Sequence, residues 1–306
     1  MPYYLGIDGG GTKTTCALGD AANLVATATA GPSNIVRVGP AQTRDSLHRA
    51  IQQACAAAGI TPEQVERTCV GGSGAGRPEF AQIVRELLEE VLATPIDVVG
   101  DMQIALEAAF DQGPGVIVIA GTGSIAYGRD REGRTLRAGG WGFAIGDEGS
   151  AHWIARSAIA ALLRLSDEDE KAADSGLAQS LFRTWKVNSL LDLARAANSI
   201  PPPDFAALFP AVVSSKDDIA REGLSSGGRE LAKLAATLVH RLFPDEATGP
   251  VPVGVTGGVF RHSELVRETF YNELRRLDPR TEVNLQVVDP VEGALRMARR
   301  AAENRN

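Results

Sequence analysis

The chain has 306 residues, of which 44% are hydrophobic and 23% charged, a composition typical of a globular protein with room for two domains. The net charge of −7 and the pI of about 5.3 argue against a broad electrostatic interaction with nucleic acid or an anionic membrane. No apolar run approaches the ~18 residues of a membrane span, and no basic leader precedes the first apolar stretch. We therefore expect a cytoplasmic protein without nucleic-acid or membrane partners.

The cysteines and histidines give no metal-binding pattern. Cys16, Cys55 and Cys69 are widely spaced, without a Cys-x-x-Cys pair, and are expected to be small core residues. The four histidines are scattered through helical stretches. We assign none of these side chains to a metal.

A glycine-rich turn follows the first apolar stretch, in the segment Tyr4-Leu-Gly-Ile-Asp8-Gly-Gly-Gly-Thr-Lys-Thr14. Consecutive glycines permit positive φ and bring backbone amides close to an anion, which predicts a phosphate loop. A carboxylate at Asp8 suits a hydrated Mg²⁺, because carboxylate and phosphate repel each other unless a cation lies between them. An ordinary hairpin turn is the alternative.

The first third of the chain alternates short strands with helices. Residues 3–7, 15–18 and 24–30 predict an antiparallel meander, and 41–58 predict a helix. Asn34, in the loop between them, is either a turn-former or an amide donor to a polyhydroxyl ligand.

Two further strands end in candidate site residues. The strand at 68–72 runs into a second glycine-rich turn, at the carboxyl end where α/β proteins place ligands. An amphipathic helix over 83–92 and a strand from Ile96 follow, and this strand stops at Asp101 before a helix over 102–110. Asp101 is either the N-cap of that helix or a carboxylate used in chemistry.

The pattern of strand, glycine turn and strand then restarts. Residues 116–120 predict a buried strand, Gly121-Thr-Gly-Ser124 a tight turn, and 125–128 and 135–138 further strands. This repetition suggests a duplicated fold whose halves face each other across a cleft.

A glycine-rich loop, residues 139–150, precedes the next helix. Ser150 is placed to cap that helix, and amides at the helix start could face an anion or a sugar hydroxyl. Trp141 is either a core residue or part of a pocket wall.

The remaining elements are helical up to a late strand. A region over 165–230 is helical without recognisable chemistry, and the strand at 252–256 ends in Gly257-Gly258, where a flat ring could lie against the backbone. The other predicted elements are helices at 231–242 and 263–277, a strand at 283–288 and a last helix from 290.

Three motifs in this order resemble the phosphate-1, phosphate-2 and adenosine motifs of the actin-like ATPase superfamily, namely Asp8-Gly-Gly-Gly-Thr12, Gly121-Thr-Gly-Ser124 and Val255-Thr-Gly-Gly-Val259. Gly139-Gly-Trp-Gly joined to Gly146-Asp-Glu-Gly-Ser-Ala resembles, more specifically, the N-acetylglucosamine kinase branch of the BadF/BadG/BcrA/BcrD ATPase family. The resemblance implies an α/β protein of two ribonuclease H-like domains with a cleft between them. These domains would comprise residues 1–115, completed by about 290–306, and 116–289 with a helical insertion at about 165–230.

The resemblance also implies roles for individual residues. ATP phosphates would contact Gly10, Gly11, Thr12, Lys13, Gly121, Thr122 and Gly123, and the nucleoside Gly257 and Gly258. Asp8 would hold Mg²⁺ through water. The sugar would lie against Asn34, Ser73, Gly74, Asp101, Gly140, Trp141, Asp147 and Ser150. Asp101 matches the family's proposed catalytic base, which agrees with the need for a carboxylate near the attacking hydroxyl; Asp147, its rival, is assigned to ring hydroxyls.

The expected activity is ATP-dependent phosphorylation of N-acetylglucosamine at O6. Met102-Gln-Ile-Ala replaces the small residues that follow the base in animal acetylhexosamine kinases, so glucosamine, N-acetylmuramic acid and unsubstituted hexoses stay open as acceptors. One alternative is an ATPase that acts on a partner protein, which would need cysteines in a loop that binds an iron–sulfur cluster. Another is a sugar-sensing regulator, which would need a basic DNA-binding segment. A homodimer is expected by resemblance alone.

Overall fold

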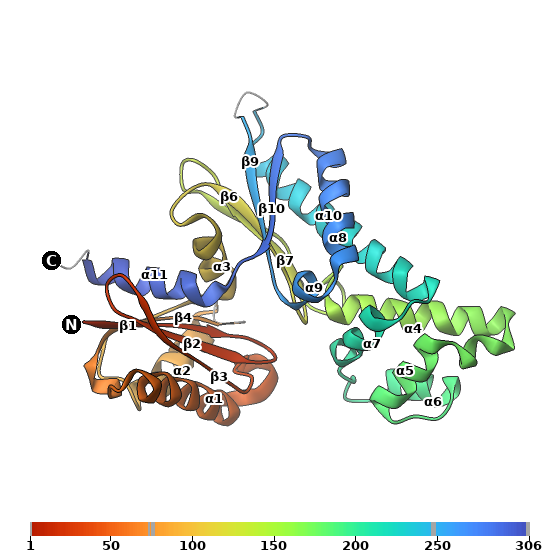
Figure 1. Cartoon of the computed structure of the whole chain (residues 1–306), viewed down its shortest axis with the longest axis horizontal. Helices are drawn as coiled ribbons and strands as arrows, with labels where there is room; N and C mark the ends of the chain where they lie inside the picture. The colour runs from red at the N-terminus through yellow and green to blue at the C-terminus, as the bar shows by residue number, and fades with distance from the viewer. Residues whose placement is uncertain (1, 73, 75–76, 246–248, 304–306) are drawn as a thin grey trace. The chain divides into compact units, whose positions relative to one another are not determined.

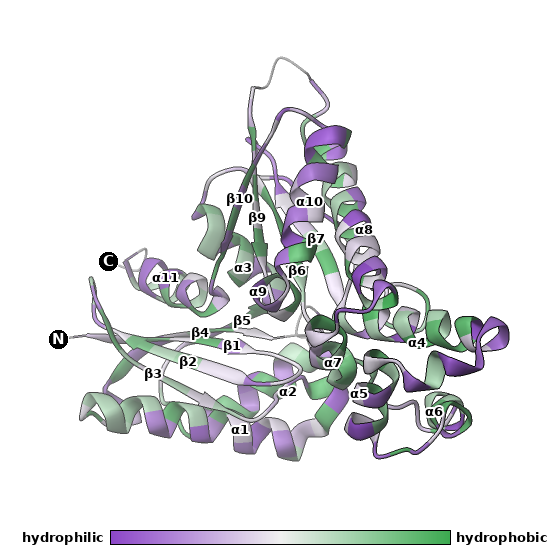
Figure 2. Ribbon diagram, turned by 45° about the vertical axis from the view of Figure 1, so that its right-hand side comes forward, coloured by the Kyte–Doolittle hydropathy of each residue, from purple (hydrophilic) through white to green (hydrophobic). Residues whose placement is uncertain are grey.

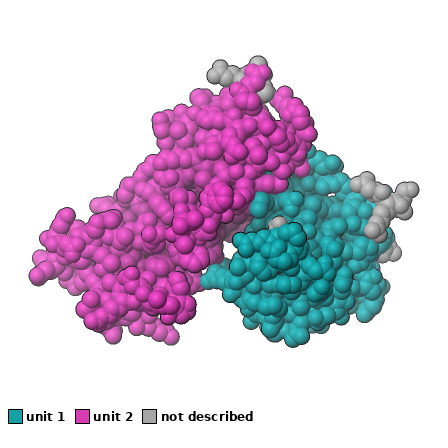
Figure 3. Space-filling model, turned by 180° about the vertical axis from the view of Figure 1, so that it is seen from behind, with its two compact units in different colours: residues 1–113, 288–306 teal, residues 114–287 magenta. Residues whose placement is uncertain are grey.

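The computed structural model describes residues 2–72, 74, 77–245 and 249–303 (Figure 1). The chain divides into two compact units, which Figure 3 shows in different colours. Unit 1 comprises residues 1–113 and 288–306, and unit 2 comprises 114–287. Each unit contains one five-stranded sheet.

The sheet of unit 1 is an antiparallel meander extended by two parallel strands. Its strand order is β3-β2-β1-β4-β5, in which β1 pairs antiparallel with β2 and parallel with β4, and β4 pairs parallel with β5. The predicted meander is confirmed. The strands are β1 (Tyr3–Gly9), β2 (Thr14–Gly19), β3 (Leu24–Ala30), β4 (Val65–Gly72) and β5 (Ile96–Gly100).

Helices cover both faces of this sheet because side chains alternate along its strands. From β1, Leu5 and Ile7 pack into one cluster with α1 and α2, whereas Tyr4 packs into another with α3 and α11. Figure 1 shows α11 and α1 on opposite sides of the sheet. The helices are α1 (Ile35–Ala58), α2 (Pro78–Glu89), α3 (Asp101–Phe110) and α11 (Pro290–Glu303), with a short 3₁₀ helix η1 (Pro62–Gln64).

The first helix begins earlier than the predicted residue 41. Asn34 caps it, and the backbone bends at Gly39, whose φ is 75°, before it continues through Pro40. Proline has no amide hydrogen to donate. Pro40 is tolerated because the bend at Gly39 already interrupts the helical hydrogen bonds at this point.

The last helix returns to unit 1 and packs very closely against it. A Cβ atom on Gly6 would lie 2.3 Å from the backbone of α11, and one on Gly293 would lie 2.0 Å from the carbonyl oxygen of Ile104. Arg300 of α11 also forms a 2.6 Å ion pair with the buried Glu107 of α3. The C-terminal helix is therefore an integral part of unit 1.

The sheet of unit 2 repeats the topology of the first. Its order is β10-β9-β6-β7-β8, with antiparallel pairing among β6, β7 and β8 and parallel pairing of β9 to its neighbours. The strands are β6 (Gly115–Ala120), β7 (Ser124–Arg129), β8 (Thr135–Gly139), β9 (Val251–Thr256) and β10 (Thr281–Val287). The expected α/β class and duplicated, ribonuclease H-like fold are confirmed.

The helices of unit 2 form one large core with its sheet. Helix α8 packs on β6, β7 and β8, and α10 packs on α8; the two-coloured helices of Figure 2 show that each carries a hydrophobic and a hydrophilic side. No helix among the described residues is long and apolar enough to cross a membrane. The helices are α4 (Ala151–Glu168), α5 (Gly176–Trp185), α6 (Leu190–Ala197), α7 (Phe209–Ser214), α8 (Asp218–Leu242), α9 (Gly258–His262) and α10 (Glu264–Leu277), with 3₁₀ helices η2 (Glu170–Asp174) and η3 (Phe205–Leu208).

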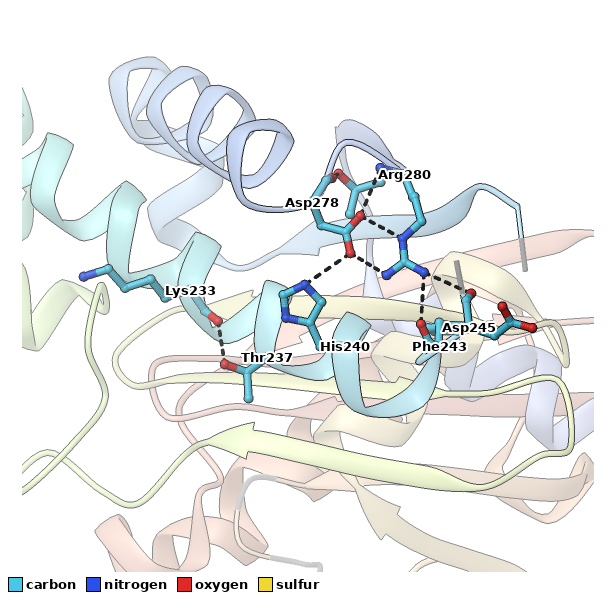
Figure 4. A network of polar contacts seen from close by, with 8 residues as sticks. Lys233, Thr237, His240, Phe243, Asp245, Asp278 and Arg280 are labelled. Carbon is cyan, nitrogen blue, oxygen red and sulfur yellow. Dashed lines mark hydrogen bonds and ion pairs between the residues drawn. The ribbon is translucent and has the colours of Figure 1, made fainter. Parts of the chain in front are cut away.

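A buried ion pair fastens the end of α8 to the turn between α10 and β10 (Figure 4). Arg280 donates to Asp278 at 2.7 Å and to the carbonyl oxygens of Phe243 and Asp245 at 3.1 Å, and His240 lies 3.4 Å from Asp278. The hydrogen bonds from Arg280 hold the pKa of Asp278 below its usual 3.8. The ionised carboxylate therefore stabilises this junction.

Replacing Asp278 by asparagine is expected to lower the free energy of unfolding of unit 2 by about 3 kcal/mol at pH 7, because a buried charge loses its partner. The native carboxylate has the lowered pKa, so its contribution is present above pH 3.8 and is lost as the pH falls below that value. Urea denaturation at pH 7 and pH 3 measures both effects. Arg276→Gln, which breaks an exposed pair with Glu273, is the matched control and should cost less than about 1 kcal/mol.

Candidate functional site

The candidate site residues of unit 1 emerge from one edge of its sheet. Gly9 of β1 pairs with Gly72 of β4, and Gly72 pairs with Gly100 of β5, so these parallel strands end side by side. The glycine loop, Gly74 and Asp101 follow these three ends. The carboxyl edge of a parallel sheet is where α/β proteins bind ligands.

The first glycine loop is a tight turn tied to a neighbouring loop. The amide of Gly10 donates to the carbonyl of Lys13 at 3.0 Å, and the carbonyl of Gly10 accepts from the amides of Ser33 and Asn34 at 3.1 and 3.2 Å. Because the loop joins antiparallel β1 and β2, its backbone is that of a hairpin turn. A hairpin turn can still bind phosphate, so this backbone does not decide between the two predicted roles.

Close packing, rather than positive φ, accounts for the glycine at position 9. The positive-φ glycines of the described chain do not include Gly9, Gly10 or Gly11, so the expectation of a left-handed turn there was wrong. A Cβ on Gly9 would lie 2.9 Å from the Ser33 hydroxyl. A side chain at this position would push the two loops apart.

Asn34 acts as a helix cap. Its side-chain oxygen accepts from the amides of Val36 and Arg37 at 3.1 and 3.2 Å, which confirms its turn-forming role. The side-chain nitrogen of Asn34 makes no hydrogen bond within the described residues and is the part that a ligand could use.

Two neighbouring carboxylates influence Asp8 at this edge. The pKa of Asp8 is raised to about 7, mainly by burial and in addition by the negative charges of Asp101 and Asp289, while Lys13 opposes the shift. Asp289, just before α11, was not foreseen as a site residue. Its one sequence signal is an aspartate between a strand and a helix, the same context as Asp101.

The acidic edge fits a hydrated magnesium ion. The described residues contain no group of three or more His, Cys, Asp or Glu side chains that could hold a metal ion. Mg²⁺ typically keeps several waters and binds one or two carboxylates plus substrate phosphates. Asp8, whose charge is disfavoured by two neighbouring acids, would be stabilised by a cation there.

Asp101 is the first residue of α3 and not its cap. Gly100 is the N-cap, and its amide donates to the side chain of Gln103 at 2.8 Å. The Asp101 carboxylate accepts from the amide of Met102 at 2.9 Å and is half-buried. The N-cap reading of Asp101 is therefore wrong.

The two glycine turns of unit 2 also lie side by side. Ile119 of β6 pairs with Thr256 of β9, so the turns that follow these parallel strands share one sheet edge. Gly257 has a φ of 104°, and a Cβ there would lie 2.2 Å from the Ala120 carbonyl oxygen. Only glycine fits at this position, which brings the predicted nucleoside turn against Ala120, the last residue of β6 before Gly121.

Asp147 joins the 139–150 loop to the turn at Gly123. Its carboxylate accepts from the amide of Gly142 at 3.3 Å, and a Cβ on Gly123 would lie 2.7 Å from one carboxylate oxygen. Burial raises the pKa of Asp147, while hydrogen bonds from the backbones of Gly142 and Ser124 oppose the shift. The carboxylate thus organises its own loop.

The other predicted residues of this loop have contrasting exposures. The Ser150 hydroxyl accepts from the amide of Trp153 at 3.1 Å, which confirms the helix cap. Ser150 has no exposed surface, and its contact with a sugar stays a prediction. Trp141 is 67% exposed, so its core reading is wrong, and Gly140 beside it has a φ of 68°.

The structure thus places the predicted residues in two groups, one in each unit. Unit 1 contains Asp8, Gly10, Gly11, Thr12, Lys13, Asn34, Gly74 and Asp101. Unit 2 contains Gly121, Thr122, Gly123, Gly140, Trp141, Asp147, Ser150, Gly257 and Gly258. Ser73 lies outside the described residues.

A cavity that was not foreseen opens at the end of α9, beside His262. Its volume is about 500 Å³, and residues of α7, α8, α9 and α10 line it, among them Arg221, Leu224 and His262. A volume of this order suits a small organic ligand. Its lining comes from separate helices at irregular spacing, which left no motif to find.

The three cysteines are buried, with at most 1% of each exposed. The expectation that they are core residues is confirmed. They occupy β2, α1 and β4, which gives an iron–sulfur cluster no exposed ligand among them.

Comparison with known proteins extends over nearly the whole chain. The chain is 30% identical to an N-acetylmuramic acid/N-acetylglucosamine kinase of Clostridium acetobutylicum, over 98% of this chain and 99% of that protein. It is 27% identical to an N-acetyl-D-glucosamine kinase of Dictyostelium discoideum, over 96% and 97%. A crystal structure of a candidate N-acetylglucosamine kinase from Chromobacterium violaceum is 25% identical and superimposes with a TM-score of 0.76, covering 97% of this chain and 99% of that one.

The family-level match agrees with these relatives and with the paired glycine turns. The family model for the BadF/BadG/BcrA/BcrD ATPases matches residues 5–298. The chain therefore belongs to the BadF/BadG/BcrA/BcrD ATPase family.

Proposed function

We propose that the chain is an ATP-dependent amino-sugar kinase that transfers a phosphoryl group to O6 of N-acetylglucosamine. N-acetylmuramic acid, glucosamine and other hexoses are the alternative acceptors. The observation that carries the proposal is the edge of unit 1 where parallel strands end side by side. Asp8 lies one residue before the end of β1, next to the glycine loop, and Asp101 directly follows β5. Relatives that align over almost the whole chain are named as kinases of such sugars.

In this proposal the amides of the glycine turns bind the phosphates of ATP. The turns assigned to phosphate comprise Gly10, Gly11, Thr12 and Lys13 and, separately, Gly121, Thr122 and Gly123. The amides of Gly10 and Gly121 donate to the carbonyls of Lys13 and Gly123, so these two residues shape the turns. Backbone amides in such turns neutralise phosphate charge without a flexible side chain. Bound Mg²⁺, held through water by Asp8, would supply further charge neutralisation on the phosphates.

The acceptor hydroxyl is activated by Asp101. Its carboxylate takes the proton of the attacking O6 hydroxyl as the O6–phosphorus bond forms and the bond between the γ-phosphorus and the β-phosphate oxygen breaks. ADP leaves, and the sugar carries the phosphoryl group. The sugar is oriented by Asn34, Gly74, Gly140, Trp141 and Asp147. Asp147 acts by fixing the loop that carries Trp141.

The nucleoside is assigned to Gly257, Gly258 and the cavity beside α9. Gly257 has no side chain to separate a ring from the backbone, and the cavity adjoins His262, the last residue of the helix that starts at Gly258.

A panel of sugars coupled to the release of ADP tests the activity. N-acetylglucosamine, N-acetylmuramic acid, glucosamine, N-acetylmannosamine and glucose would each be added with ATP and Mg²⁺. At least one N-acetylated hexosamine is expected to raise ADP release well above the rate without sugar. If none of the five sugars does so, the kinase assignment is wrong and an ATPase acting on a partner protein takes its place.

A further inference from the structure

Arg137, the third residue of β8, is held in a fixed position against the 139–150 loop. Its guanidinium carbon lies 4.2 Å from the ring centroid of Trp141. One terminal nitrogen donates to the carbonyl oxygens of Gly139 at 2.8 Å and Gly140 at 3.3 Å. The cation is thus stacked on one aromatic face and anchored by one of its nitrogens.

The backbone that Arg137 holds is itself constrained. Gly139 and Gly140 have φ angles of 72° and 68°, a region that favours glycine. A Cβ on Gly140 would lie 2.7 Å from the side chain of Ile125, and one on Gly139 would lie 3.1 Å from Leu234. The two carbonyl oxygens that accept from Arg137 therefore lie on a constrained backbone.

The charge of Arg137 has no partner among the described residues. No carboxylate of the described chain lies within ion-pairing distance of it, whereas Arg134 on the same hairpin pairs with Asp130 at 2.8 Å. Arg137 is exposed, and its second terminal nitrogen and its Nε make no hydrogen bond with the described residues. A planar guanidinium with two free donors on one edge matches a carboxylate.

We propose that Arg137, stacked on Trp141, binds a carboxylate on the acceptor sugar and so favours an N-acetylated hexosamine that carries an acidic ether substituent, as N-acetylmuramic acid does. The inference rests on the proposed function, which assigns Gly140 and Trp141 to the sugar. The acidic chain gives the cation a further role, because its net charge of −7 would otherwise repel an anionic sugar. Arg137 is then a residue that determines specificity and takes no part in proton transfer.

The test compares two sugars that differ only in the lactyl group. For Arg137→Gln, KM for N-acetylmuramic acid is expected to rise about 10- to 100-fold, the loss of a charged hydrogen-bonded pair, while KM for N-acetylglucosamine changes less than about 2-fold. The value of kcat should stay the same for both sugars. Arg137→Lys keeps the charge but loses the planar fork, so an intermediate KM for N-acetylmuramic acid is expected.

Two controls separate recognition from structural support. Arg195→Gln removes an exposed arginine from α6, 70% exposed and paired with Asp192, and should leave the ratio of the two KM values unchanged. Raising the ionic strength should raise KM for N-acetylmuramic acid alone. If Arg137→Gln raises KM equally for both sugars, Arg137 only supports the loop and the inference is wrong.

Other results also decide the matter. The inference is wrong if the wild-type protein phosphorylates N-acetylglucosamine but neither phosphorylates nor binds N-acetylmuramic acid. If no sugar is phosphorylated, the proposed function fails, and calorimetric titration of the two sugars still tests Arg137. Tighter binding of N-acetylmuramic acid that Arg137→Gln abolishes supports the inference, and equal or absent binding overturns it.

Discussion

Asp101→Asn is expected to reduce kcat for phosphoryl transfer about 10²- to 10⁴-fold, the usual contribution of a general base. Asparagine keeps the size of the side chain and can still accept the hydrogen bond from the amide of Met102, but it cannot take the proton of the attacking hydroxyl. KM for the sugar should change little, because the hydrogen-bonding shape is retained. Steady-state kinetics and a thermal melt separate lost catalysis from lost folding.

A matched control lies on β5, the strand that Asp101 follows. Asp97 of β5 pairs with Arg67 at 2.9 Å, away from the end of the strand, and Asp97→Asn should retain kcat within about 3-fold while weakening that ion pair. If Asp101→Asn keeps near wild-type kcat, Asp101 is not the base, even if the protein proves to be a kinase.

Asp8→Asn is expected to lower kcat/KM for MgATP at least about 100-fold, because it removes the carboxylate assigned to the metal. Excess Mg²⁺ should restore only part of the activity. Activity measured across a range of Mg²⁺ concentrations tests this, and an unchanged Mg²⁺ dependence would remove Asp8 from the metal site.

The same substitution should stabilise the metal-free protein above neutral pH. Burial and neighbouring acids raise the pKa of Asp8 from 3.8 to about 7, so between these values the folded chain keeps a proton that the unfolded chain has released. The free energy of unfolding of the wild type therefore falls as the pH rises through this window. Asparagine carries no such charge, and the variant loses this dependence.

Thermal melts in EDTA at pH 5 and pH 8 measure the effect. The Tm of Asp8→Asn should exceed that of the wild type at pH 8 by about 2–4 °C for each kcal/mol gained, and the difference should shrink at pH 5. A difference that is equal at both pH values would contradict the raised pKa. If Asp8→Asn lowers activity and raises the Tm, the Asp8 carboxylate is needed for function although it destabilises the metal-free protein.

The local parts of this architecture could be predicted from the sequence. Strand ends followed by glycines are encoded in a few neighbouring residues, and this is why the turns after β1, β6 and β9 were found. The duplicated meander follows from the same local pattern repeated near Gly121. Ser150 was likewise recognisable as a cap because capping depends on the adjacent amides, and Asn34 was recognisable as a turn-former for the same reason.

Features that depend on distant contacts were missed. Asp289 influences Asp8 only because α11 folds back onto unit 1, where Gly6 and Gly293 permit close packing. The N-cap reading of Asp101 failed because the preceding Gly100 is capped by the side chain of Gln103, and a sequence offers no rule for choosing between adjacent residues.

The 139–150 loop was recognised as irregular, but its arrangement was not. Trp141 lies exposed under Arg137, although a tryptophan more often suggests core. The Asp147 carboxylate turns inward onto its own loop because Gly123 leaves room for it. Contacts of this kind are set by packing between turns, which no short motif records.

The kinase activity is tested most directly by identifying the product with ³¹P and ¹H NMR after incubation with ATP, Mg²⁺ and N-acetylglucosamine. We predict a new phosphomonoester signal coupled to the two protons on C6 of the sugar, formed in step with ADP and absent with Asp101→Asn. Release of inorganic phosphate alone, at a rate that the sugar does not change, would contradict the account.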